Sequence, residues 1–125
     1  VPFAAADKLA AYQAAYAFEA SLRALAAQPH DGPLPSALSF LHVDPPSFIL
    51  SAVKAAEDGR GWIARGYNLG GETLDVTLTA WKPFAHVERV NLGEEPLPEQ
   101  SISVEGQAVR FTARGHEVVS LRFAA

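Results

Sequence analysis

Histidines are the first residues in this chain that could do chemistry, because neutral imidazole is the commonest protein ligand for metals such as zinc. No two of them lie within four residues of each other, so no pair can share one face of a helix as many zinc ligands do. A site assembled across strands stays open, with His42 and Asp44 as its first two ligands. The alternative is that all four are ordinary surface or half-buried residues. The histidines are His30, His42, His86 and His116.

Paired carboxylates are the second candidate, because glycoside hydrolysis uses two carboxyl groups that face each other about 5–10 Å apart across a cleft. The chain offers Glu57-Asp58 and Glu94-Glu95. Both pairs are adjacent in sequence and fall in predicted turns or loops, where charged side chains are usually solvated. We expect surface charges at both places and no catalytic pair.

Nucleophilic catalysis has no clear carrier in this sequence. Cys is absent, and neither Ser51 nor Ser120 lies in the glycine-flanked turn that exposes a catalytic serine. Gly70-Gly71 lacks the lysine and the following helix of a phosphate-binding loop. The residues by themselves therefore indicate no active site.

Aromatic side chains are the remaining candidates, since they can stack on sugar rings. Trp62, Tyr67 and Trp81 are available for such a role. Trp81 falls on the same face of its predicted strand as three polar residues between positions 75 and 79, so it could be exposed. Either Trp81 binds a sugar, or it packs against the sandwich or a neighbouring domain, and we favour packing.

One small domain must position these residues. The chain has 125 residues, of which 49% are hydrophobic and 19% charged, a balance typical of a globular protein and not of a disordered one. Its net charge of −4 argues against a dedicated nucleic-acid-binding protein, whose surface would be basic. No apolar run reaches the roughly 20 residues that a membrane-spanning helix needs, so we expect no membrane partner.

The first residue is Val1, and the chain contains no Met. A newly translated chain begins with Met, so we expect that upstream residues have been removed or that the chain is a fragment of a larger protein.

A helix is predicted over about residues 7–19. Asp7 is a suitable N-cap, and Leu9 and Tyr12 follow it at helical spacing. Residues 20–27 fit a helix and a strand about equally well, and we leave both open.

A proline-rich segment follows. Residues 28–36 contain three prolines and one glycine, which predicts a connecting loop. We therefore divide the chain into residues 1–36, a helix with its connecting segment, and residues 37–125, a single β domain.

Short strands fill the β domain at spacings of about 8–12 residues, with no helical pattern between them. Because parallel strands would need crossover helices, the sequence predicts an antiparallel β-sandwich of about eight strands, preceded by one helix. The segment 48–53 is apolar on both faces and is expected to be an interior strand. The predicted strands are residues 38–43, 48–53, 62–69, 74–81, 84–92, 101–105, 108–114 and 117–123.

Turn signals add finer predictions. Asp58-Gly59 and Gly70-Gly71 are both typical of two-residue hairpin turns. The apolar pattern slips between Val87 and Val90, which predicts a β-bulge.

One stretch of the sequence has a residue pattern that is more specific than the formation of strands and turns requires. Residues 50–59 and 62–68 resemble the "S-A-x-K-x-x-E-D-G" and "R-x-Y-N" segments of the C-terminal region of family 38 glycoside hydrolases, the α-mannosidases. The matching residues are Ser51, Ala52, Lys54, Glu57, Asp58, Gly59, Arg65, Tyr67 and Asn68.

Weaker matches extend the resemblance over most of the chain. Residues 17–22 are similar to the family's "A-x-x-F-N-x-P-L" lead-in, and residues 117–123 to its closing strand. Four departures stand out: Glu19 and Ser21 replace the usual Asn and Pro, Ser120 replaces Thr, and Gly66 stands where the family usually has an apolar residue. The family would make residues 20–27 a strand.

The resemblance implies a non-catalytic C-terminal β-sandwich domain that packs on its own catalytic domain upstream and helps to shape the substrate cleft. Family members are retaining α-mannosidases that act through an Asp nucleophile beside a divalent metal, usually zinc. Those motifs are not in this sequence, so no catalytic, cofactor-binding or metal-binding residue is carried over, and zinc is expected only in the catalytic domain. By resemblance to bacterial members, the expected location is cytoplasmic.

Arg65 and Asn68 have two interpretations within the resemblance. Arg65 could pair with a carboxylate and Asn68 could cap a turn, or this strand end could face the catalytic domain. For the chain as a whole, the alternatives are a self-sufficient carbohydrate-binding module and a structural sandwich that mediates oligomer contacts.

Overall fold

A computed structural model describes residues 7–124 of the chain. The chain divides into two compact units, one ending at Leu38 and the other beginning at Ser39. The first unit holds the helix α1 (Lys8–Glu19), and the second holds every strand of the described chain.

Helix α1 begins as predicted. The Asp7 carboxylate accepts a hydrogen bond of 2.9 Å from the N–H of Ala10, so it caps the first turn. Residues 20–27 form neither the helix nor the strand that the sequence left open. Leu22 and Leu25 are fully exposed there, and a short apolar segment without a surface to pack on has nothing to stabilise either structure.

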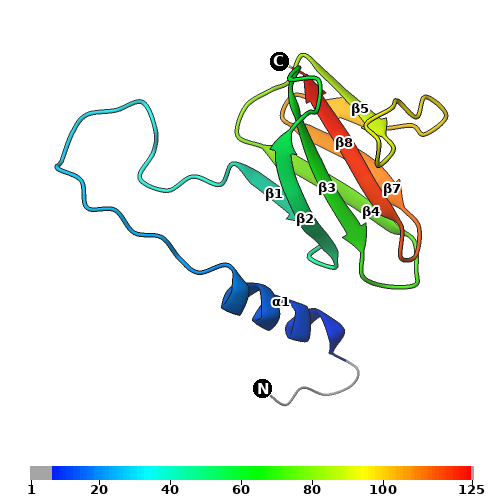
Figure 1. The fold of residues 1–125 in the computed structure, drawn as a ribbon, viewed down its shortest axis with the longest axis horizontal. Helices are drawn as coiled ribbons and strands as arrows, with labels where there is room; N and C mark the ends of the chain where they lie inside the picture. The colour runs from blue at the N-terminus through cyan, green and yellow to red at the C-terminus, as the bar shows by residue number, and fades with distance from the viewer. Residues whose placement is uncertain (1–6, 125) are drawn as a thin grey trace. The chain divides into compact units, whose positions relative to one another are not determined.

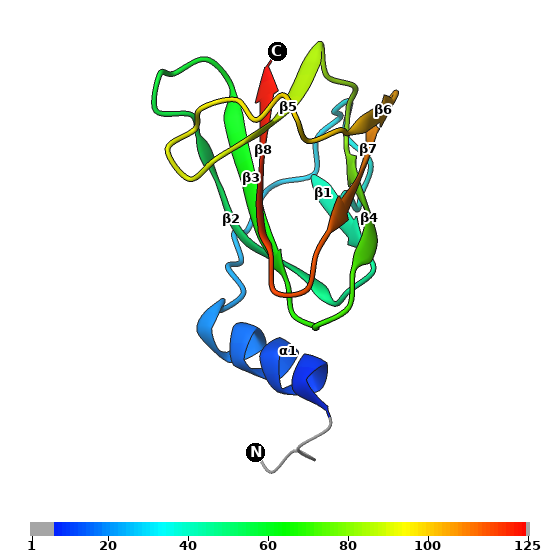
Figure 2. The same ribbon diagram turned by 90° about the vertical axis from the view of Figure 1, so that its right-hand side faces the viewer.

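Residues beyond the helical unit fold into two four-stranded antiparallel sheets that face each other (Figures 1 and 2). Sheet A has the order β1 (Leu41–Asp44), β4 (Leu74–Ala80), β7 (Ala108–Ala113), β6 (Ser103–Glu105). Sheet B has the order β2 (Phe48–Ala55), β3 (Trp62–Asn68), β8 (Val118–Ala124), β5 (His86–Val90). The predicted antiparallel β-sandwich of eight strands after one helix is confirmed.

The core lies between the inner faces of the two sheets. In β4 apolar and polar residues alternate, and Val76, Leu78 and Ala80 are buried. Leu121 and Phe123 of β8 lie in the same core cluster. Each large apolar side chain buried here stabilises the sandwich by about 1.5–3 kcal/mol, and together they hold the sheets in register.

Strand β2 lies at an edge of sheet B, so the expectation that residues 48–53 form an interior strand is wrong. An edge position is sufficient for this strand, because Phe48 is its only fully buried residue and the others are half-buried or exposed. The strand also carries the bulge of this sheet, between Leu50 and Ala52.

Asp58-Gly59 does lie in a hairpin, since β2 and β3 pair from Ala55 opposite Trp62 and Gly59 has a positive φ of 70°. The connection spans residues 56–61, however, so it is longer than the predicted two-residue turn. Gly70-Gly71 does not lie in a hairpin. It connects β3 in sheet B to β4 in sheet A, so the chain crosses between layers instead of returning beside itself.

No bulge occurs in β5, which pairs with β8 in continuous register over its whole length. The slip in the apolar pattern has another cause. Arg89 takes an inward-facing position after Val87, while Val90 packs on the outer face of sheet B with Ala56 and Ile63. The buried arginine thus interrupts the apolar pattern of the sequence and resembles the shift that a β-bulge would cause.

Within residues 7–124, no helix is long and apolar enough to cross a membrane.

Candidate functional site

Residues of the family-like segments gather on the outer face of sheet B. The loop after β5 folds back over this face, and its Glu94 and Leu92 reach side chains of the segments. We call this region the motif face. Its polar members are Ser51, Lys54, Glu57, Asp58, Arg65, Ser120 and Arg122, together with Glu94 from the loop.

Glu94 is the centre of one half of the motif face. Its side chain is only 7% exposed, and its carboxylate accepts hydrogen bonds from the Lys54 ammonium at 2.6 Å and the Glu57 N–H at 2.7 Å. Lys54 also pairs with the Glu57 carboxylate. The expectation that Glu94 is a solvated loop charge is therefore wrong. A left-handed φ of 65° at Glu94 accompanies this inward placement.

Asp58 and Arg122 form the other half of the motif face. The Arg122 guanidinium donates to the Asp58 carboxylate at 2.5 Å, and the Arg60 N–H donates to the other carboxylate oxygen at 2.9 Å. These contacts join the β2–β3 loop to β8, which is why a Glu-Asp-Gly turn at this point stabilises the sheet.

Electrostatics on the motif face oppose acid–base catalysis. Hydrogen bonds from Lys54, and then from the Glu57 N–H, lower the pKa of Glu94. The Arg60 N–H, and then Arg122, lower the pKa of Asp58. A general acid needs a raised carboxyl pKa so that it keeps its proton near neutral pH. These carboxylates stay ionised and hold structure together.

Arg65 pairs with no carboxylate among residues 7–124, contrary to the first interpretation. Its Nε donates to the Ser120 hydroxyl at 2.9 Å and its Nη2 to the Leu92 carbonyl at 3.3 Å. The guanidinium therefore fixes the loop after β5 to the middle of sheet B.

Asn68 caps the turn after β3, as that interpretation expects. Its Oδ1 accepts from the Gly70 N–H at 2.9 Å, and its Nδ2 donates to the carbonyls of Glu72, Ala113 and Arg114. The side chain is completely buried. It ties the β3–β4 crossing to the end of β7 and cannot itself contact another domain.

His42 and Asp44 lie side by side on the outer face of β1, opposite Thr79 and Thr77. No third ligand joins them. Across residues 7–124, no group of three or more His, Asp or Glu side chains comes close enough to hold a metal ion.

The aromatic candidates have different surroundings. Trp62 stacks on Phe123 with ring centroids 4.1 Å apart, so this face of the indole belongs to the core. Tyr67 is half-buried in β3. Trp81 is 42% exposed and packs edge-on against Phe40 at 5.7 Å, which leaves it the most accessible of the three.

Sequence reasoning missed Arg89. Its side chain is 6% exposed, and it donates to the Glu117 carboxylate and to the Thr112 carbonyl, both at 3.0 Å. Burial lowers its pKa although the Glu117 charge opposes that shift. The only signal in the sequence is the slip in the apolar pattern of β5.

Comparison with known families identifies the sandwich. The model described as the glycosyl hydrolases family 38 C-terminal beta sandwich domain matches residues 47–121, which is more than half of the chain. Neither the curated proteins nor the solved structures gave a significant match.

Proposed function

Because the chain belongs to the family 38 glycosyl hydrolase C-terminal β-sandwich domains, we propose that it serves its parent enzyme without taking part in the chemistry. In this role it packs on the catalytic domain of the parent and supports the rim of the substrate cleft. The parent hydrolyses α-mannosides with retention of configuration, and zinc is held by the catalytic domain.

The N-terminal arm, which we define as residues 7–38, carries this proposal. None of its side chains is buried, and Phe18, Leu22 and Leu25 are 93%, 101% and 94% exposed. Leaving large apolar side chains in water is unfavourable by about 25 cal/mol per Å² of apolar surface. A surface of the catalytic domain that covers these three residues would remove that cost and dock the sandwich.

The motif face supports a non-catalytic role. Its carboxylates are ionised and paired with cations or backbone N–H groups, which leaves none of them placed as a general acid. The family-like residues instead join strands and loops of the sandwich to one another.

Carbohydrate binding through aromatic stacking is less well supported. Trp62 already stacks within the core and Tyr67 is half-buried, so Trp81 is the most exposed of the three candidates. Its exposed surface is equally suited to packing against the parent.

The first test measures hydrolysis of an aryl α-mannoside by the 125-residue chain alone, with zinc supplied. We expect a rate no higher than that of buffer. Hydrolysis that purifies with the chain would overturn the proposal.

The second test replaces Leu22 or Leu25 with Glu in the parent enzyme. We expect lower kcat and earlier heat inactivation of the parent, because a carboxylate cannot be buried at the docking surface without cost. Val104→Glu is the matched control, since it places the same charge on an exposed apolar position of the sandwich. Equal behaviour of all three variants would contradict docking by the arm.

A further inference from the structure

A groove runs around one edge of the sandwich, beside the segment that brings the chain from sheet B to sheet A. This crossing segment, residues 99–103, joins sheet A only at Ser103, where β6 begins to pair with β7. Three hollows of about 380, 190 and 260 Å³ lie beside it.

The three hollows are neighbours. Ser101 and Thr112 line both the first and the second, and Arg89, Gln100 and Glu117 line both the second and the third. Together they make one extended groove that begins on the outer face of sheet A and ends on the outer face of sheet B, where Ser120 of the motif face lines the third hollow.

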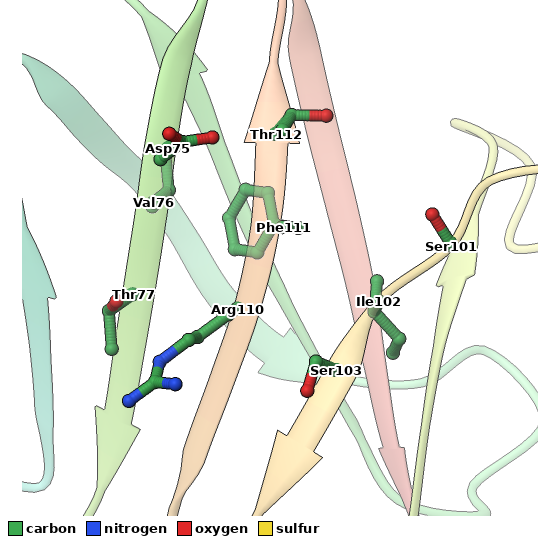
Figure 3. A pocket seen from close by; sticks show the side chains of 9 residues that line it. All are labelled: Asp75, Val76, Thr77, Ser101, Ile102, Ser103, Arg110, Phe111 and Thr112. Atoms are coloured by element: carbon green, nitrogen blue, oxygen red, sulfur yellow. The ribbon is translucent and has the colours of Figure 1, made fainter.

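Side chains of the first hollow rise from three neighbouring strands or their approaches (Figure 3). Asp75 and Thr112 face each other across β4 and β7, as the register requires. Neither side chain has a hydrogen-bond partner within residues 7–124. Both side chains are exposed, so water hydrates their oxygens and a ligand in the hollow can reach them.

Charges along the groove balance. Its basic residues are Arg89, Arg110 and Arg114, and its acidic residues are Asp75, Glu99 and Glu117. Arg89 is paired with Glu117 at 3.0 Å, and Arg110 with Glu105 at 3.1 Å. A free anion would meet carboxylates, and a free cation would meet guanidinium groups, so neither is favoured.

The rest of the lining suits hydroxyl groups. Hydroxyls of Ser101, Ser103 and Thr112 and the amide of Gln100 can each donate and accept a hydrogen bond. Ile102 and Leu97 add apolar surface. A ligand that both donates and accepts at many points, has apolar C–H surface and carries no charge fits this lining.

We propose that the groove binds a neutral saccharide. Its hydroxyls would hydrogen-bond Asp75 and Thr112 in the first hollow, and a second ring would extend toward Gln100 and Glu117. The site is distinct from Trp81, which lines none of these hollows. The proposed saccharide site is also independent of the proposed docking of the N-terminal arm, so a negative result for one would leave the other unaffected.

The test is an NMR titration of the isotope-labelled full chain with mannobiose, maltose and cellobiose, and separately with inorganic phosphate. We expect at least one disaccharide to shift the amide signals of residues 101–103 and 110–112. Asp75→Asn and Thr112→Val should weaken that binding about tenfold each, because the first replaces a charged acceptor oxygen with a donor NH2 and the second removes a hydroxyl.

Two controls keep the result specific. Thr79→Val makes the same change as Thr112→Val on the outer face of sheet A but outside the groove, and Trp81→Ala removes the aromatic alternative. Both should bind the saccharide as the unsubstituted chain does, and melting temperatures should show that every variant is folded.

Three outcomes would overturn the proposal. They are no signal shift with any of the disaccharides up to about 10 mM, shifts centred on Trp81 that vanish in Trp81→Ala, and binding of phosphate alone. None of these readouts depends on activity of the parent, so they leave the proposed packing role unaffected.

Discussion

The two outer faces of the sandwich use polar residues in opposite ways. On the motif face of sheet B, Glu94, Asp58 and Arg65 all have partners within the chain. On the groove side of sheet A, Asp75 and Thr112 have none among residues 7–124. The family-like segments thus lie where the fold needs them for its own assembly, and the groups left available to a ligand lie outside those segments.

The largest expected effect comes from Asn68→Ala, at the end of the family-like strand. This change leaves three carbonyls and the Gly70 N–H without their side-chain partner in a buried place. We expect the free energy of unfolding to fall by about 3 kcal/mol, measured by urea denaturation. Asn91→Ala, which breaks two hydrogen bonds in an exposed loop, is the control and should cost about 1 kcal/mol or less. Equal losses would show that burial of Asn68 does not matter.

The next largest loss of stability is expected at Gly66, and it tests why this residue departs from the family. A Cβ at this position would lie 2.3 Å from the Phe48 ring and 2.7 Å from the Ile49 carbonyl oxygen. We therefore expect Gly66→Ala to lower the free energy of unfolding by about 2 kcal/mol.

Phe48→Leu supplies the second side of that test. The double variant lacks the Phe48 ring but keeps the Ile49 carbonyl oxygen beside the new Cβ. Its loss of unfolding free energy should therefore be smaller than the sum of the losses of the two single variants. Strictly additive losses would contradict the idea that Phe48 occupies the space that Gly66 leaves.

Acid should reduce the contribution of the motif face to the free energy of unfolding. The pKa values of Glu94 and Asp58 are lowered in the folded chain, so their contribution is present above the pKa of the unfolded chain, about 4. It is lost as pH falls through the lower folded pKa values, because the unfolded chain then binds more protons. Unfolding measured between about pH 6 and pH 2 should show this loss.

Lys54→Met isolates the Glu94 part of that pH dependence. Without the ammonium, the pKa of Glu94 should rise toward its ordinary value, and the loss of stability below about pH 4 should become smaller. An unchanged pH profile in Lys54→Met would argue against the Lys54–Glu94 pair as its source.

The smallest effect is expected on the groove side. Asp75→Asn and Thr112→Val remove no contact within the described chain, so the free energy of unfolding should change by no more than about 0.5 kcal/mol. A loss as large as that of Asn68→Ala would remove the contrast between the two faces.

Sequence patterns predicted the elements well where the signal is local. The Asp7 cap and the hairpin at Asp58-Gly59 each depend on neighbours in the chain, and the structure confirms both, although the hairpin loop is longer than two residues. The candidate site was harder. Glu94 was taken for a solvated charge because its partner Lys54 lies forty positions upstream.

The sequence by itself determined the fold class, because alternation, turn residues and the cap are set by local stereochemistry and by the need to bury apolar side chains. Only the tertiary structure decided that Gly70-Gly71 crosses between sheets, that Arg89 points inward, and that Asp75 and Thr112 share a hollow. These depend on which strands become neighbours and on the partners that buried polar groups find far away in the chain.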